Sequence, residues 1–532
     1  MGDDLSDLPE GWVLVQLGEV FSIYVGATPS RKNKDFWGGK IPWVSSGEVA
    51  FCKIYKTVEK ITRSGLKNSS TNIHPPGTIL LGMIGEGKTR GQVAILEVAA
   101  CNNQNSAAIR VSEASLSPQY IYYFLESEYQ NTRRIGSGNN QQALNKTRVQ
   151  RIYFPLPPLN EQHRIVAKIE ELFSKLDAGI ELLNKLKIKL KRYRQAVLKA
   201  AVEGNLTKEW REANQEELEP ASELLKRILK QRREKWEADE LAKMEAKGKA
   251  PKNDKWKQKY KEPVAPDTSD LPELPDGWCL GTFDQVSERV TVGHVGSMKN
   301  EYIEQGIPFL RSQNVRANRY DSEGLKFISK KFHEQLKKSS LQPGDLVVVR
   351  SGSVGVSCVI PQTLGEANCS DLVIVKQPRA INSYYASFYM NSVARRRISE
   401  KQVGVALTHF NTKSMAAMPI PIPFKYEQSK IVEKVEYYFS AIDYLEKTIE
   451  TNLKRSEKLR QSILKQAFTG QLVPQDPKDE PASKLLERIK AEKAQREAQQ
   501  KAKKKTRKTT KKSRKTNKTK QLELDIKNND LG

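Results

Sequence analysis

Apolar residues between positions 12 and 154 fall in short runs that are separated by clusters of Gly, Pro, Ser and Asn. Runs such as 77–84 and 92–98 have the length of strands, and the clusters between them are typical of turns. One stretch, 118–134, has the spacing of a helix. The second half repeats this order, with a helical run at 382–398. The pattern predicts two mixed domains of the α+β class.

A different period begins after residue 158, where apolar residues recur at alternating spacings of four and three. This spacing predicts a helix over about 160–201 with a heptad stripe, and a similar helix after 424. Gly204 and Gly470 stand where such helices would end. We favour pairing of the two helices, and packing of each helix on its own domain is the alternative. The stripes consist of Ile165, Ile169, Leu172, Leu176, Leu183, Leu186, Leu190, Tyr193 and Val197, and of Ile431, Val435, Tyr438, Ile442, Leu445, Ile449, Leu459 and Ile463.

The chain is a tandem duplication with an offset of 266 residues, which is half of its 532 residues. The pentapeptide at 8–12 (LPEGW) returns at 274–278 (LPDGW), and 161–206 matches 427–472 at 16 of 46 positions without a gap. Residues 203–261 continue as a charged helix, and four prolines then mark a linker. The predicted layout is a domain at 1–158, a helix at 159–205, a helical extension and linker at 206–275, a second domain at 276–424, a second helix at 425–470, an extension at 471–500 and a basic disordered tail at 501–532.

The formal charge of +26 is concentrated at the end of the chain, since residues 501–520 contain twelve Lys or Arg and no acid. Such a tail can add salt-sensitive attraction to polyanions, or it can serve only solubility. No apolar run is long enough to span a bilayer, and residues 1–10 do not resemble a signal peptide. Five cysteines without a CxxC pair do not indicate a disulfide framework or a zinc ribbon. We therefore expect a cytoplasmic protein with no contact to membranes.

No catalytic constellation is evident in the sequence. Residues 82–89 (GMIGEGKT) fit the G-x-x-x-x-G-K-T pattern of a phosphate-binding loop, but a strand-like run follows where that loop needs a helix. A loop between two strands is the preferred interpretation. The five histidines are scattered and do not form a metal-binding motif, and the loops of an adenine methyltransferase are missing. The chain is expected to bind no cofactor and to have no enzymatic activity of its own.

Polar loops are the remaining candidates for function, and they are where the two copies differ most. Arg suits guanine edges and Asn or Gln suits adenine edges, although the same residues are also ordinary turn formers. Divergent loops on a repeated framework suggest that two different sequences are read. The candidate DNA-binding residues are Ser45, Ser46, Glu48, Lys88, Thr89, Arg90, Asn139, Gln141, Gln142 and Asn145 in the first copy, and Arg311, Gln313, Asn314, Arg350, Ser351, Ser353, Thr408, His409 and Asn411 in the second.

The chain resembles the specificity subunits of type I restriction–modification systems over nearly its whole length. The resemblance rests on residues 155–166 (PLPPLNEQHRIV), 470–477 (GQLVPQDP) and 480–486 (EPASKLL). The first motif returns in weaker form at 419–428, where Tyr426 and the loss of Pro-Pro-Leu make the start of the second helix less certain.

The resemblance implies two target recognition domains held on an antiparallel coiled coil. It implies a bipartite, asymmetric site on double-stranded DNA, two methyltransferase subunits that use S-adenosylmethionine, and restriction subunits that use ATP and magnesium. The alternative is a helical adaptor that meets nucleic acid only through its basic tail.

Overall fold

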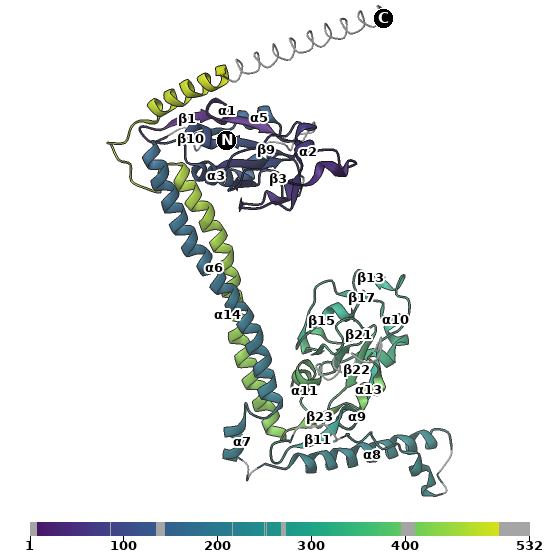
Figure 1. Ribbon diagram of the computed structural model, residues 1–532. Coiled ribbons are helices and arrows are strands. Elements are labelled where there is room, and N and C mark those ends of the chain that lie inside the picture. The colour runs from purple at the N-terminus through teal and green to yellow at the C-terminus, as the bar shows by residue number, and fades with distance from the viewer. Residues whose placement is uncertain are drawn as a thin grey trace, which may run out of the picture. The chain divides into compact units, whose positions relative to one another are not determined.

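The computed structural model describes residues 8–85, 87–134, 144–214, 216, 218–248, 251, 253–267, 273–394 and 410–499 (Figure 1). The chain divides into two compact units, of which unit 1 comprises 1–182 and 451–532 and unit 2 comprises 183–450. Each unit contains one mixed domain and one segment from each of two long helices.

The domain of unit 1 is built on a five-stranded sheet in the order β2-β9-β6-β7-β4, beside a three-stranded sheet β5-β3-β8 and the pair β1-β10. Strands β6 and β7 are buried along their whole length, as expected for short apolar runs between turns. The elements are β1 (Val13–Gln16), α1 (Leu17–Val20), β2 (Ser22–Val25), η1 (Lys34–Phe36), β3 (Trp37–Val44), η2 (Ser46–Glu48), β4 (Cys52–Ile54), β5 (Glu59–Ile61), α2 (Arg63–Lys67), β6 (Thr78–Gly82), β7 (Val93–Leu96), β8 (Cys101–Asn102), β9 (Ser106–Arg110), η3 (Val111–Ala114), α3 (Pro118–Ser127), α4 (Tyr129–Arg134), α5 (Lys146–Gln150) and β10 (Tyr153–Leu156).

The domain of unit 2 repeats this plan with a four-stranded sheet β12-β22-β19-β20, a five-stranded sheet β13-β17-β14-β21-β18, and the pairs β11-β23 and β15-β16. Its elements are β11 (Cys279–Thr282), α9 (Phe283–Val286), β12 (Arg289–Val292), β13 (Tyr302–Ile303), β14 (Ile307–Leu310), η6 (Ser312–Asn314), β15 (Val315–Arg316), β16 (Arg319–Tyr320), β17 (Lys326–Ile328), α10 (Lys330–Gln335), η7 (Lys337–Ser339), β18 (Ser340–Leu341), β19 (Leu346–Val349), β20 (Ser357–Val359), η8 (Gln362–Leu364), β21 (Ala367–Cys369), β22 (Leu372–Lys376), α11 (Ser383–Tyr389), the π-helix η9 (Met390–Ala394), α13 (Thr412–Ala416) and β23 (Pro419–Ile422).

The duplication read from the sequence is visible in the strand registers. Val13 pairs with Leu156 in the first copy, and Cys279 pairs with Ile422 at the same offset in the second. The predicted duplication of a mixed domain is thereby confirmed.

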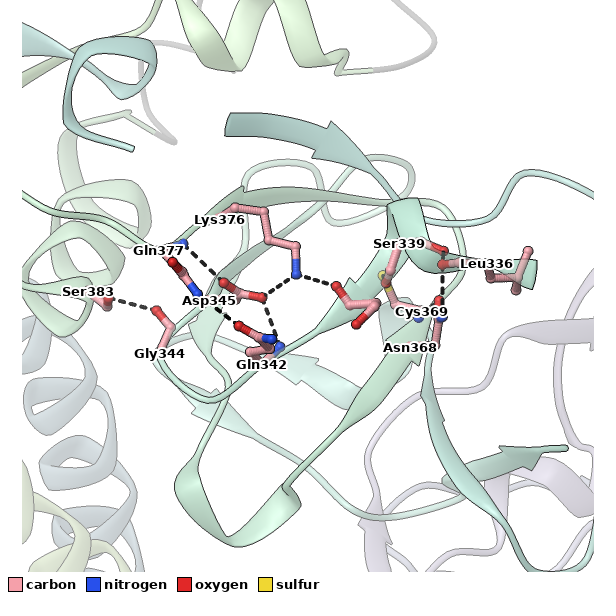
Figure 2. A network of polar contacts seen from close by, with 11 residues as sticks. Leu336, Ser339, Gln342, Gly344, Asp345, Asn368, Cys369, Lys376, Gln377 and Ser383 are labelled. Carbon is pink, nitrogen blue, oxygen red and sulfur yellow. Dashed lines mark hydrogen bonds and ion pairs between the residues drawn. The ribbon is translucent and has the colours of Figure 1, made fainter. Parts of the chain in front are cut away.

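In the second copy, a buried ion pair joins the start of β19 to the end of β22 (Figure 2). Lys376 Nζ lies 2.7 Å from the fully buried Asp345 carboxylate and also donates to the carbonyl of Ser340. In the first copy Arg110 donates to the carbonyl of Ile73 and pairs with Glu113 at 3.0 Å instead. Lys376 and Arg110 thus stand at the ends of the equivalent strands β22 and β9, but each pairs with a carboxylate from a different position of its copy.

The long helices α6 (Leu159–Val202) and α14 (Lys425–Phe468) agree with the predicted ranges to within a few residues. Gly204 and Gly470 follow their ends with φ values of 75° and 73°, the left-handed conformation that glycine adopts without strain.

Within each unit the paired segments of α6 and α14 run in opposite directions. In unit 2, Lys187 pairs with Glu450 while Arg194, further along α6, pairs with Asp443. In unit 1, Ile165 and Ile169 share one core with Ile463 and Leu464. The predicted stripe is incomplete, since Leu186, Tyr193, Leu445 and Leu459 are 39–49% exposed.

The charged stretch at 203–261 is not one helix, which corrects the sequence interpretation. It forms α7 (Lys208–Asn214), α8 (Ala221–Glu245) and the 3-10 turn η5 (Asp254–Lys259). Pro220 precedes α8, and Gly248 with φ 64° follows it, so proline and glycine interrupt the helical run. Within unit 2, helix α8 packs on the mixed domain through Leu224 and Ile228.

Candidate functional site

The first candidate loop of unit 1 is a short turn held by its own side chains. The Glu48 carboxylate accepts hydrogen bonds from Ser45 N at 2.8 Å, Ser45 Oγ at 2.9 Å and Val58 N at 2.9 Å. Ser45 and Glu48 thus fix the turn η2 to the segment between β4 and β5. Ser46 lies on the same turn and is partly exposed.

Three chain segments of unit 1 meet beside this turn. The Phe51 ring packs edge-on against Tyr129 of α4 at 5.0 Å, and the Tyr129 hydroxyl donates to the carbonyl of Lys88 at 2.8 Å. Arg133 donates to the same hydroxyl at 3.0 Å. Phe51 has a φ of 53°, which is strained for a bulky side chain and is often found at functional sites.

The glycine loop between β6 and β7 carries three further candidates. The exposed Lys88 and the partly exposed Thr89 lie in turns rather than at the start of a helix, so this is a loop between two strands as predicted. The Arg90 guanidinium donates to the carbonyl of Arg133 at 3.1 Å.

The other candidates of unit 1 lie near the start of α5 or before it. Asn145 accepts from Arg148 N at 2.9 Å and therefore caps α5. Asn139, Gln141 and Gln142 lie outside the described residues.

Unit 2 has an equivalent turn with a different chemistry. Asn314 is fully buried, accepts from Arg311 N at 3.0 Å, and donates to the carbonyls of Asp321 and Glu323. Arg311 donates to the carbonyl of Gly324 at 2.8 Å, and Gln313 is exposed next to it. Asn314 is thus a turn-forming residue, whereas Gln313 is exposed and Arg311 is partly buried.

Two of the remaining candidates of unit 2 contact Asp371. Arg350 pairs with its carboxylate at 2.9 Å, and Ser351 donates to it at 3.2 Å. The carbonyl of Arg350 accepts from Phe410 N, which brings the loop 350–355 next to residue 410. The last candidates differ in their placement: Ser353 is exposed, Asn411 caps α13, and Thr408 and His409 lie outside the described residues.

An exposed tip that the sequence reading missed lies beside these loops in unit 1. Tyr55 is 67% exposed and Val58 is 87% exposed, and Lys53, Lys56 and Lys60 flank them on the surface. The tip thus presents apolar side chains among cations on the surface of unit 1. The available signal was the interleaving of basic and aromatic residues at 53–56 (KIYK).

Comparison with known proteins gives these loops a context. The family model of the type I restriction modification DNA specificity domain matches residues 9–192 and again 275–455. Together the two matches cover more than half of the chain. The chain belongs to this family.

Curated relatives agree with the family in name and in length. The type I restriction enzyme EcoKI specificity subunit of Escherichia coli K12 is 26% identical over 517 residues, which cover 92% of this chain and 96% of that protein. The EcoBI specificity subunit of Escherichia coli is 26% identical over 430 residues, 79% of this chain and 80% of that protein.

Solved structures show the same fold. A chain from a study of complex assembly and conformational transition of the type I R-M system has a TM-score of 0.60 at 17% identity, with 87% of this chain and 99% of that chain covered. The HsdS subunit of Thermoanaerobacter tengcongensis has a TM-score of 0.52 at 17% identity, with 88% and 100% covered.

The chain is accordingly a specificity subunit, which recognises a DNA target and is not itself an enzyme. None of the helices in the described part of the chain combines the length and the apolar character that a bilayer crossing requires.

Proposed function

We propose that this specificity subunit reads an asymmetric, bipartite site on double-stranded DNA, with one half-site for each domain. The observation that carries the proposal is the repetition of one framework with different side chains at equivalent turns, Glu48 in unit 1 and Asn314 in unit 2. Phosphate contacts would supply most of the affinity, and loop side chains would discriminate between bases. In this proposal the two target recognition domains comprise residues 1–158 and 276–424.

The structure narrows the set of residues that we propose for base contacts. Ser45, Glu48, Asn145, Asn314 and Asn411 use their side chains to build turns and helix caps, so we propose that they position the reading loops. The surface residues Ser46, Lys88, Gln313 and Ser353 are better placed to touch DNA, and Tyr55 and Val58 join them as apolar contacts.

Mapping of modified adenines in the host genome, with and without this gene, tests the proposal. We expect one bipartite motif to lose its methylation. Replacement of 276–424 by the corresponding domain of another specificity subunit should change only one half of that motif. A symmetric motif, or a change in both halves after the replacement, would contradict the proposal.

We further propose that two methyltransferase subunits dock on this chain, followed by restriction subunits, and that S-adenosylmethionine, ATP and magnesium are held by these partners. A stripe on α14 supports the docking: Tyr426, Tyr437 and Tyr444 are 71%, 72% and 71% exposed. Separations of 11 and 7 residues are close to whole numbers of turns, so the three rings share one face. Aromatic residues of this kind are enriched at protein interfaces.

A Tyr437→Lys/Tyr444→Lys variant tests the docking. It should lose co-purification with the methyltransferase subunit but keep its helical circular dichroism. Glu436→Lys changes the net charge by +2, as the double tyrosine variant does, on the neighbouring exposed face of the same helix and serves as the control. Unchanged assembly of the double tyrosine variant would contradict docking at this stripe.

A further inference from the structure

A cavity of about 380 Å³ lies in unit 2 between α8, the segment 259–261 and the start of the second domain, and none of the candidate DNA-binding residues lines it. Its lining combines aromatic and charged side chains. It is formed by Ile228, Arg232, Lys235, Trp236, Asp239, Lys259, Tyr260, Lys261, Gln285, Ser287, Glu288 and Arg379.

The aromatic wall of the cavity is rigidly supported. The Trp236 ring stacks on Trp256 at 6.0 Å and contacts the Tyr260 ring at 5.3 Å. The Tyr260 hydroxyl oxygen is buried and has no hydrogen-bond partner among the described residues. A buried donor without an acceptor is costly, unless a ligand supplies the acceptor.

Positive charge exceeds negative charge at this site. Arg232 is paired with Asp284 at 3.2 Å, while Lys235 and Arg379 share the single carboxylate of Glu288 at 3.4 Å and 3.2 Å. Within the part of the chain that the structure describes, no ion-pair partner is found for Lys259 or Lys261, which line the same cavity. Asp239 is the remaining acid of the lining.

The chain next to the lining segment 259–261 is hydrogen-bonded to the second domain. Val264 N donates to the Asp284 carboxylate at 3.2 Å, and Thr282 Oγ1 donates to the carbonyl of Val264 at 2.7 Å. In unit 1 the helix 482–499 packs on its own domain through the matching motif but contains no aromatic residue. Unit 1 has a cavity of about 290 Å³ at the equivalent place, lined among others by Glu113, Lys493 and Arg496. The hollow is therefore part of the repeat, and within the described residues unit 2 adds the aromatic wall and the lysines of the segment 259–261.

We propose that this cavity is a phosphate-binding site. Lys259 and Lys261 would pair with the phosphate oxygens, Lys235 and Arg379 would add further positive charge, and the Tyr260 hydroxyl would donate the fifth contact. Phosphate oxygens accept several charge-assisted hydrogen bonds at once, which matches this set of donors. The DNA backbone and a free phosphate compound both offer this chemistry, and the experiment separates the two sources.

The test uses the full-length chain and isothermal titration with inorganic phosphate, ATP without metal, and a duplex that lacks the target site. The Lys259→Gln/Lys261→Gln variant should bind the phosphate probe at least about tenfold more weakly, because it loses two charge-assisted contacts. The Tyr260→Phe variant keeps the ring and should weaken binding severalfold. Lys247→Gln/Lys255→Gln removes the same charge from exposed positions of this extension that do not line the cavity, and should bind like the unaltered chain.

Competition identifies the source of the phosphate. If it is the DNA backbone, the duplex displaces the small probe, and the double variant lowers the slope of log affinity against log salt by about one to two. If it is a free compound, the probe stays bound in saturating duplex. Absence of binding by all three probes, or equal binding by the two double variants, would overturn the proposal.

Discussion

Two buried glutamates at equivalent positions show how the copies have diverged at the scale of single residues. The Glu427 carboxylate accepts from Trp278 Nε1, Arg211 and Thr207, each at 2.7 Å. Glu161 accepts only from Trp12 Nε1, at 2.9 Å, and its second oxygen has no partner among the described residues. Burial raises the pKa of Glu161, and this outweighs the lowering effects of Trp12 and Arg164.

The two glutamates should respond differently to the same substitution. Glu427→Gln should destabilise unit 2 by about 3–5 kcal/mol, because it leaves the Arg211 guanidinium buried beside a neutral group. Burial opposes the ionised form of Glu161, so ionisation of this carboxyl costs stability as the pH rises, and Glu161→Gln should be neutral or slightly stabilising at neutral pH. Hydrogen exchange of the two units measures both effects, and equal losses would refute the contrast.

The buried His74 should make the stability of unit 1 sensitive to acid. Its ring is fully buried, and burial, together with the neighbouring Arg110, lowers its pKa from 6.5 to about 4 although Asn102 bonds to the ring. The folded state therefore keeps His74 neutral while the unfolded chain takes up a proton. The free energy of unfolding should fall by up to about 3 kcal/mol between pH 6.5 and pH 4. In His74→Gln, denaturation curves across this range should show a shallower dependence on pH.

Single residues were also where the sequence was least informative. The repeat located the divergent loops, but it could not tell an Asn that reads bases from one that caps a helix. Asn145 and Asn411 precede short helices and cap them, a role that Asn commonly takes and that a search for helix starts would have found. The buried Asn314 amide donates to the backbone carbonyls of Asp321 and Glu323, and no local sequence pattern predicts these contacts.

Elements were predicted far better than loops, because a heptad stripe over 44 residues specifies a helix with little ambiguity. The failure at 203–261 has the opposite cause. Lys, Arg and Glu favour helices wherever they stand, so composition alone did not reveal where Pro220 and Gly248 divide the extension.

Helix α8 and the helix 482–499 each contact a mixed domain through a cation that binds backbone carbonyls. In unit 1, Lys493 Nζ donates to the carbonyls of Gly18, Glu19 and Phe21 at 2.5, 3.2 and 3.3 Å. In unit 2, Arg232 donates to the equivalent carbonyls of Asp284 and Ser287. A cation at these carbonyls satisfies groups that the short helices α1 and α9 leave open.

Removal of this cation should detach the helix locally. Lys493→Met should cost about 1–3 kcal/mol in unit 1 and speed proteolysis within 482–499, because three carbonyls lose a charged donor. Lys490→Met removes a largely exposed pair with Glu19 and should cost less than about 1 kcal/mol. Equal proteolysis of the two variants would contradict a specific role for Lys493.

At the scale of the whole molecule, the basic tail separates a specificity subunit from the rival adaptor. An adaptor that meets DNA only through residues 501–520 would lose all binding when 501–532 are deleted. We expect the truncated chain, assembled with its methyltransferase, to keep its preference for the target over other DNA, with a smaller salt dependence of the affinity. Gel-shift titrations at two salt concentrations measure both quantities.

The spacing of the two half-sites is the last property that the duplicated architecture predicts. If the paired helices set this spacing, their length must translate into base pairs. Deletion of 187–193 from α6 and of the facing 444–450 from α14 removes one heptad from each helix and keeps the phase of the stripe. Thr451→Tyr is added to the deletion, because Thr451 takes the place of Tyr444 and the docking stripe must keep its tyrosine. Seven residues correspond to about 10 Å of helix, or about three base pairs of duplex. The methylated motif should keep both half-sites and lose about three unread positions between them. The alternative deletion of 187–193 alone puts the two helices out of step and should abolish assembly. An unchanged spacer in the double deletion would show that the helices do not measure the site.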